Sequence, residues 1–134
     1  MQPHSYVALV TIAALLTYFW MGLRVGQARA KSGVAAPAMT GDPILERHIR
    51  VHYNTLEWLP IFLAAMWLFA IYWNDLIAAG LGVVWIVGRV LYALGYVADP
   101  KKREAGFMIQ LAATAILLFG AAGRIIWTLA VVGA

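Results

Sequence analysis

Three polar side chains at helical spacing, Arg50, Asn54 and Glu57, are the residues of this sequence best suited to chemistry. They lie in the run RVHYNTLEWLP, at the start of an apolar stretch that continues to Trp73. Offsets of four and seven residues return nearly to the same angle on an α-helix, so all three would share one face. A cation, an amide and an anion are costly to expose to lipid, and in membrane helices such residues usually face a bundle interior or a wet cavity. The pattern therefore predicts a functional site on this helix.

A second polar face is predicted further along the chain, where Arg89, Tyr92 and Tyr96 recur at offsets of three and four. Arg89 is far in sequence from both ends of its apolar stretch, so we expect a buried pairing with Glu57 or with a ligand. A purely structural buried ion pair is the alternative. Tyrosine is common at headgroup depth, which is the alternative for Tyr96. Arg103 closely follows Pro100 and is expected in the first turn of the fourth helix, where taken alone it would be a solvated charge.

Two other sets of polar residues do not predict a binding site. His48 and His52 have the i, i+4 spacing of metal ligands, but no third histidine is near and the chain contains no cysteine. We therefore predict no metal site and interpret them as part of an interfacial polar face. Arg124 is expected either to reach outward to the headgroups or to pair with Asp75 or an adjacent subunit.

Composition places the chain among membrane proteins. Of its 134 residues 63% are hydrophobic and only 12% are charged, which is too apolar for a small soluble domain. We expect residues 1–134 to form a single domain. Without cysteine the chain has no disulfide or thiolate metal site, so any thiol chemistry must come from a substrate. The distribution of the net charge of +4 indicates membrane topology rather than nucleic-acid binding, so we expect no nucleic-acid partner.

The predicted fold class is an all-α membrane protein, a bundle of four transmembrane helices. Each predicted span can cover a hydrocarbon core of about 30 Å, which needs about 20 residues. The second span is expected on a helix that begins earlier, at Pro43. The four spans are Tyr6 to Arg24 or a little beyond, Leu56 to Trp73, Leu76 to Ala98, and Ala105 to the C-terminus.

The turns and the charges predict the topology. Asp42-Pro43 and Asp99-Pro100 each combine a helix N-cap with a proline suited to the first helical position, and so start the second and fourth helices on the same side. Eight of the ten Lys and Arg residues flank these two connections. The positive-inside rule then places this side in the cytoplasm and both termini outside. The first apolar stretch lacks a preceding positive region, so we expect a retained helix rather than a cleaved signal peptide. We expect the membrane to be a bacterial inner membrane.

The polar residues together suggest a class of ligand. Guanidinium groups bind carboxylates or phosphates through paired hydrogen bonds, and a carboxylate binds an ammonium group. A small zwitterion with extra negative charge would suit such a set better than a metal or a fatty acid. Glutathione, with two carboxylates, one ammonium and one thiol, is one molecule of this kind.

The order Arg50-x3-Asn54-x2-Glu57, followed by Tyr92-x3-Tyr96-x6-Arg103, resembles MAPEG, the membrane-associated proteins in eicosanoid and glutathione metabolism. The resemblance covers nearly the whole chain. The motif in the second helix is moderately specific by itself, and its combination with the later tyrosines and arginine is strong.

The resemblance implies a homotrimer that binds glutathione between adjacent subunits near the cytoplasmic face. Arg50, Asn54 and Glu57 would then hold the charged ends of glutathione. Tyr92 and Tyr96 would contact it from helix three of the neighbouring subunit.

The family pattern also implies roles for two further arginines. Arg103 would face the sulfur and favour the thiolate, since a nearby guanidinium lowers a thiol pKa from its unperturbed value of about 8.5. Arg29 matches an arginine at the end of the first helix that also contacts glutathione. Arg89 has a counterpart in some members, with a less settled role.

Departures from the family pattern affect the predicted lipid specificity. Trp58 stands where eicosanoid-forming members often have tyrosine, and His52 stands where some relatives have glutamine. We therefore expect a general glutathione S-transferase that conjugates lipophilic electrophiles entering from the bilayer, with glutathione peroxidase activity as a further option. The alternatives are a small proton-coupled multidrug exporter that uses Glu57 as its proton and substrate carboxylate, and a binding protein that has lost catalysis.

Overall fold

Four long helices make up the computed structural model, which describes residues 3–133. All four helical segments are long and apolar enough to cross a membrane, so the predicted four-helix membrane fold is confirmed. A short 3-10 turn, η1 (Pro100–Arg103), precedes the last helix. The α-helices are α1 (Ser5–Ser32), α2 (Pro43–Tyr72), α3 (Asp75–Ala98) and α4 (Glu104–Val131).

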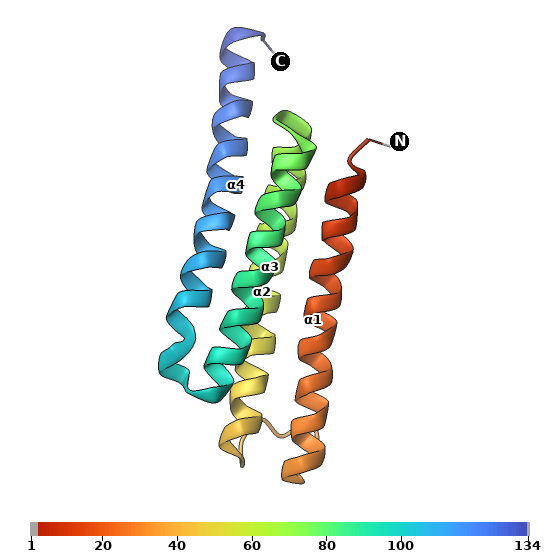
Figure 1. Cartoon of the computed structure of the whole chain (residues 1–134), viewed down its shortest axis with the longest axis vertical. Coiled ribbons are helices and arrows are strands. Elements are labelled where there is room, and N and C mark those ends of the chain that lie inside the picture. Colours follow the sequence, from red (N-terminus) through yellow and green to blue (C-terminus); the bar gives the residue numbers. More distant parts are fainter. Residues whose placement is uncertain (1–2, 134) are drawn as a thin grey trace.

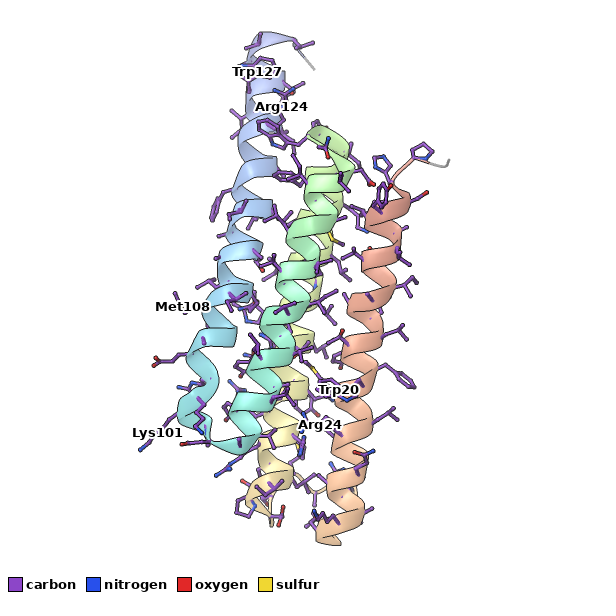
Figure 2. All side chains as sticks on the ribbon, viewed as in Figure 1. Trp20, Arg24, Lys101, Met108, Arg124 and Trp127 are labelled. Carbon is purple, nitrogen blue, oxygen red and sulfur yellow. The ribbon has the colours of Figure 1, made fainter. Side chains whose placement is uncertain are left out.

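The two ends of the bundle differ in what they carry (Figure 1). The α1–α2 loop and η1 lie at one end, while the two ends of the chain and the α2–α3 turn lie at the other. Lys101 therefore lies at the opposite end of α4 from Arg124 and Trp127 (Figure 2). The two basic connections share one end of the bundle, as the sequence predicted.

Aspartate caps begin both helical segments that follow an Asp-Pro pair. The Asp42 carboxylate accepts a hydrogen bond from the Leu45 backbone N–H at 2.9 Å, and α2 begins at Pro43 as predicted. The Asp99 carboxylate accepts from the Lys101 N–H at 3.1 Å, but this cap starts η1 rather than α4. Arg103 consequently lies on a 3-10 turn and not in the first α-helical turn that was expected.

The first helix is longer than its apolar stretch. The apolar span was predicted to reach Arg24 or a little beyond, and the helix continues past it to Ser32, with Arg29 in its last turn. Gly33 ends it with a positive φ of 77°, a conformation that glycine adopts without steric cost, and its N–H bonds the Arg29 carbonyl at 2.9 Å.

Stacked aromatic rings occupy the centre of the apolar core. The Phe62 and Trp85 rings, from α2 and α3, lie 4.0 Å apart and almost parallel. Around the outside, large apolar side chains such as Leu9 and Phe119 are 69% and 70% exposed. An apolar exterior around an apolar core is the arrangement that lipid requires of a membrane protein.

Helices α3 and α4 approach each other closely at Gly106. A Cβ added there would collide with the backbone N of Tyr92 and would lie 2.6 Å from the carbonyl oxygen of Gly88. Small residues of this kind let two membrane helices touch through their backbones. The contact places the start of α4 directly beside the Tyr92 segment of α3.

We expect Gly106→Ala to destabilise the bundle, because the added methyl has backbone rather than a flexible side chain as its neighbour. Overpacking of this kind costs about 1–3 kcal/mol. Thermal unfolding of the purified protein in mild detergent measures the loss.

Gly123→Ala on the same helix is the matched control, since a Cβ there meets nothing within 4 Å. Because alanine is the better helix former by about 1 kcal/mol, this variant should be as stable as the original protein or more so. Equal destabilisation by both substitutions would contradict the importance of the Gly106 contact.

Candidate functional site

A cavity of about 530 Å³ lies between α2, α3 and the start of α4. Its volume is within the range of about 300–1,000 Å³ that is common for ligand sites. Five of the seven residues predicted for the site line this cavity, all from one chain. The lining residues are Arg50, Asn54, Tyr92, Tyr96, Arg103, Glu104, Phe107 and Met108.

The α2 wall of the cavity consists of Arg50 and Asn54, one helical turn apart. Arg50 is exposed, and Asn54 is half-buried with its side-chain oxygen accepting a hydrogen bond from Arg89 at 2.8 Å. This wall therefore combines an exposed guanidinium with an amide whose orientation is held from behind.

The α3 wall consists of Tyr92 and Tyr96, whose rings stack at 5.7 Å. Tyr92 is buried and Tyr96 is half-buried. The family resemblance implied that these tyrosines contact a ligand from a neighbouring subunit. Within the single chain they line the same cavity as Arg50 and Asn54, because α3 packs directly against α2.

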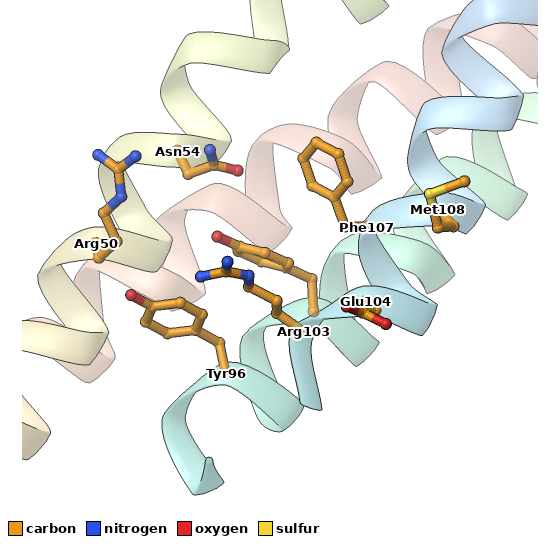
Figure 3. Close-up of a pocket in the computed structure, with 8 residues that line it drawn as sticks. Arg50, Asn54, Tyr96, Arg103, Glu104, Phe107 and Met108 are labelled. Carbon is orange, nitrogen blue, oxygen red and sulfur yellow. The ribbon is translucent and has the colours of Figure 1, made fainter. Parts of the chain in front are cut away.

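Arg103 closes the cavity from η1. Figure 3 shows its guanidinium extending toward Tyr96 and toward Arg50 on α2, whereas Glu104 points away from them. Two guanidinium groups thus approach one space, which gives the cavity a positive charge suited to a carboxylate or a thiolate.

The α4 side of the cavity is apolar. Phe107 is half-buried and meets the Trp58 ring edge-on at 5.7 Å, while Met108 is 59% exposed at the outer edge. Sequence reasoning missed both residues. For Phe107 the sequence did contain a signal: it lies four residues after Arg103, a spacing that puts two residues on the same face of a helix.

Glu57 does not line this cavity. It is exposed and lines a second hollow of about 510 Å³, whose other walls include Arg50 and Tyr53. At 3.6 residues per turn, Asn54 and Glu57 are turned to opposite sides of Arg50 and differ by roughly 60° around the helix. That difference is enough to direct Asn54 toward α3 and Glu57 away from it, while Arg50 lines both hollows.

Arg29 also lies outside the cavity. Its guanidinium donates a hydrogen bond to the Ala38 carbonyl at 2.7 Å and so ties the end of α1 to the α1–α2 loop. Within a single chain, no contact joins Arg29 to the other predicted site residues that the structure describes.

Arg89 is fully buried, and of the two partners predicted for it, Glu57 or a ligand, Glu57 is not one. Its Nη2 donates to Asn54 at 2.8 Å and to the Thr55 hydroxyl at 2.7 Å. The reason is the helical angle: the α2 face that meets α3 carries Asn54 and Thr55, and Glu57 is turned outward. Thr55 gave no signal in the sequence, because one threonine in an apolar helix is unremarkable.

The remaining polar residues have other partners. His52 stacks on the Tyr18 ring at 4.4 Å. Arg124 lies against the Trp73 and Trp127 rings, at 4.7 and 4.5 Å, and not against Asp75. Among residues 3–133, no group of three or more His, Cys, Asp or Glu side chains is placed to hold a metal ion.

Comparison with known proteins finds similarity along most of the chain. The sequence model of the MAPEG family matches residues 7–123. A Synechocystis protein described as uncharacterized is 49% identical, over 91% of this chain and 89% of its own length. Human microsomal glutathione S-transferase 2 is 42% identical, over 87% of this chain and 80% of its own. Leukotriene C4 synthase of Cavia porcellus is 33% identical, over 85% and 76%.

Proposed function

The chain belongs to the MAPEG family, and from that premise we propose that it is a membrane-embedded glutathione S-transferase that conjugates lipophilic electrophiles. Relatives named for glutathione transfer support a glutathione-related transferase at the level of the family. The observation that carries the proposal for this chain is the convergence of Arg50, Arg103 and Asn54 on one cavity.

Glutathione binding would use the charges on the walls of the cavity. Arg50 would hold a carboxylate through paired hydrogen bonds, and the Asn54 amide would donate a further one. Tyr92 and Tyr96 would contact the peptide from α3. Glu57 would bind the ammonium group where the ligand extends past Arg50, since Arg50 lines both hollows.

Arg103 would stabilise the sulfur as a thiolate. The guanidinium lowers the thiol pKa from about 8.5, so that the proton leaves to solvent near neutral pH. The thiolate then attacks the electrophilic carbon and forms a C–S bond. The electron pair of the broken bond leaves with the leaving group. Catalysis would come from thiolate stabilisation and proximity, without a covalent bond to the protein.

The lipophilic electrophile would approach along Phe107 and Met108. These side chains form the apolar edge of the cavity, and Met108 is largely exposed on the outer surface of the bundle. An electrophile dissolved in the bilayer could reach the thiolate there without crossing the polar walls.

A homotrimer would resolve the exposure of Arg50 and Glu57, which a single chain leaves uncovered on a helix able to span the membrane. Charged groups facing lipid are costly, and another copy of the chain would cover them. Arg29, outside the cavity in one chain, could then reach a ligand held by a neighbour. By the positive-inside rule we place the cavity near the cytoplasmic face of a bacterial inner membrane, with both termini outside.

Arg103→Ala should reduce turnover more than binding. Without the guanidinium the pKa of bound glutathione rises toward that of the free thiol, so the thiolate fraction at pH 7 falls by about tenfold for each unit. Ultraviolet thiolate absorbance measured across a pH series, together with steady-state rates, tests this. Lys102→Ala, which removes the adjacent exposed cation, should change neither. Full activity in Arg103→Ala would show that another group stabilises the thiolate.

Arg50→Ala and Glu57→Gln should weaken glutathione binding itself. Loss of a charge-assisted bond costs about 1.5–3 kcal/mol, or roughly tenfold to a hundredfold in Kd. Calorimetry in mild detergent measures the effect, with Lys31→Ala as an exposed cation on the same end of the bundle for control. Unchanged affinity in both variants would remove the proposed site. Absence of binding to the folded, unmodified protein would instead favour the exporter interpretation.

Native mass spectrometry in mild detergent should detect three copies of the chain. The expected association follows from the exposed Glu57 on α2, which lies within the predicted span and would be costly against lipid. A population of only monomers or dimers would contradict the trimer and leave the exposure of Glu57 unexplained.

A further inference from the structure

Arg89 is a cation enclosed within the bundle. It has 0% exposure, and no carboxylate among residues 3–133 lies within ion-pair distance of it. Its Nε and Nη1 groups are buried without a hydrogen-bond partner. A buried, uncompensated guanidinium is costly, so its presence requires a reason beyond filling space.

The contacts that Arg89 does make lead to the cavity. Nη2 donates to the Asn54 side-chain oxygen and to Thr55, and the guanidinium carbon lies 4.4 Å from the Tyr92 ring centroid. Asn54 and Tyr92 both line the cavity, one from α2 and the other from α3. One buried side chain therefore contacts both polar walls from behind.

The hydrogen bond to Asn54 fixes which end of the amide faces the ligand. A guanidinium has donors and no acceptor, so the atom it contacts must be the amide oxygen. The NH₂ group of Asn54 is then left for the cavity, where it can donate to a carboxylate or carbonyl oxygen. Without Arg89 the amide could turn over and present an acceptor, which would repel the same ligand atom.

The contact with Tyr92 uses a different property of the same group. A planar guanidinium can stack flat on an aromatic face while donating hydrogen bonds from its edge, and a lysine ammonium has no flat face with which to stack. Tyr92 in turn stacks on Tyr96 at 5.7 Å. The Arg89 contact that holds Tyr92 in place therefore also stabilises the position of Tyr96.

We propose that Arg89 is a positioning residue for the cavity, which orients the Asn54 amide as a donor and holds the Tyr92 ring without touching the ligand. This inference rests on the proposed function, because the ligand used to test it is glutathione. Arg89 differs in this from Arg50 and Arg103, whose guanidinium groups line the cavity directly.

A double-mutant cycle separates positioning from general stability. We would measure the glutathione Kd of the unmodified protein, Asn54→Ala, Arg89→Gln and the double variant. Loss of one well-placed hydrogen bond in Asn54→Ala should weaken binding by about tenfold. In the Arg89→Gln background the same substitution should cost less than about threefold, because coupled residues are not additive. Equal fold-changes in both backgrounds, or an unaltered Kd in Arg89→Gln, would overturn the inference.

Leu117→Ala is the matched control for loss of stability. Leu117 has 0% exposure and lies in the apolar core on α4, where it does not line the cavity. The variant should lower the melting temperature but keep the Kd within about twofold, since distant sites are usually independent. If it weakened binding as much as Arg89→Gln, the effect of Arg89 would be general destabilisation. Should Arg89→Gln fail to fold, Arg89→Lys replaces it in the cycle, because it keeps the charge but not the planar fork.

Melting temperatures of the same four proteins provide a readout that does not depend on glutathione. Asn54→Ala should lower the melting temperature of the unmodified protein and have little effect in the Arg89→Gln background. If the unmodified protein does not bind glutathione, the proposed function fails, and this thermal cycle alone decides the inference. Equal thermal losses in both backgrounds would then overturn it.

Discussion

Backbone contact between α3 and α4 at Gly106 is the constraint on which the cavity depends. It holds the Tyr92 segment of α3 against the start of α4. Gly106 itself lies only a few residues after Arg103. A larger residue would separate the helix that carries the tyrosines from the turn that carries the arginine. Since lipid provides no hydrophobic force between helices, close packing of this kind is what holds a membrane bundle together. The chemistry proposed for Arg103 therefore depends on a residue without a side chain.

The buried Arg89 is the second contact that holds the walls of the cavity together. Arg89 crosses the interior from α3 to α2 and links Asn54 to Tyr92, so the two polar walls are held in one register. Arg50 and Glu57, which lie two turns apart on α2, are exposed in the single chain. The single chain thus contains a fixed inner wall and an uncovered outer one. This asymmetry is the physical argument for a second copy, because Glu57 lies within the predicted span that begins at Leu56, where a charge that faces lipid is costly.

Much of this could be predicted from the sequence because the signals were local. Asp42-Pro43 marked the start of α2, and the apolar runs marked four helices, since both effects depend on neighbouring residues. Helical spacing likewise puts Tyr92 and Tyr96 on one face, whereas Arg103 was included in the predicted site only through the resemblance to MAPEG. The partner of Arg89 could not be predicted this way. It depends on how α2 is rotated against α3, and a rotation of roughly 60° decides between Asn54 and Glu57.

The absence of cysteine limits what the cavity can contribute to a reaction. With no thiol of its own, the chain cannot act as the sulfur nucleophile, and the residues lining its cavity supply charge and orientation instead. Electrostatic preorganisation of that kind works only if the charged groups are already fixed before the ligand arrives. Arg50 and Arg103 are exposed and long, and their fixed frame must come from the residues around them. The Arg89 contacts with Asn54 and Tyr92, and the close approach of α3 and α4 at Gly106, provide that frame behind the exposed arginines.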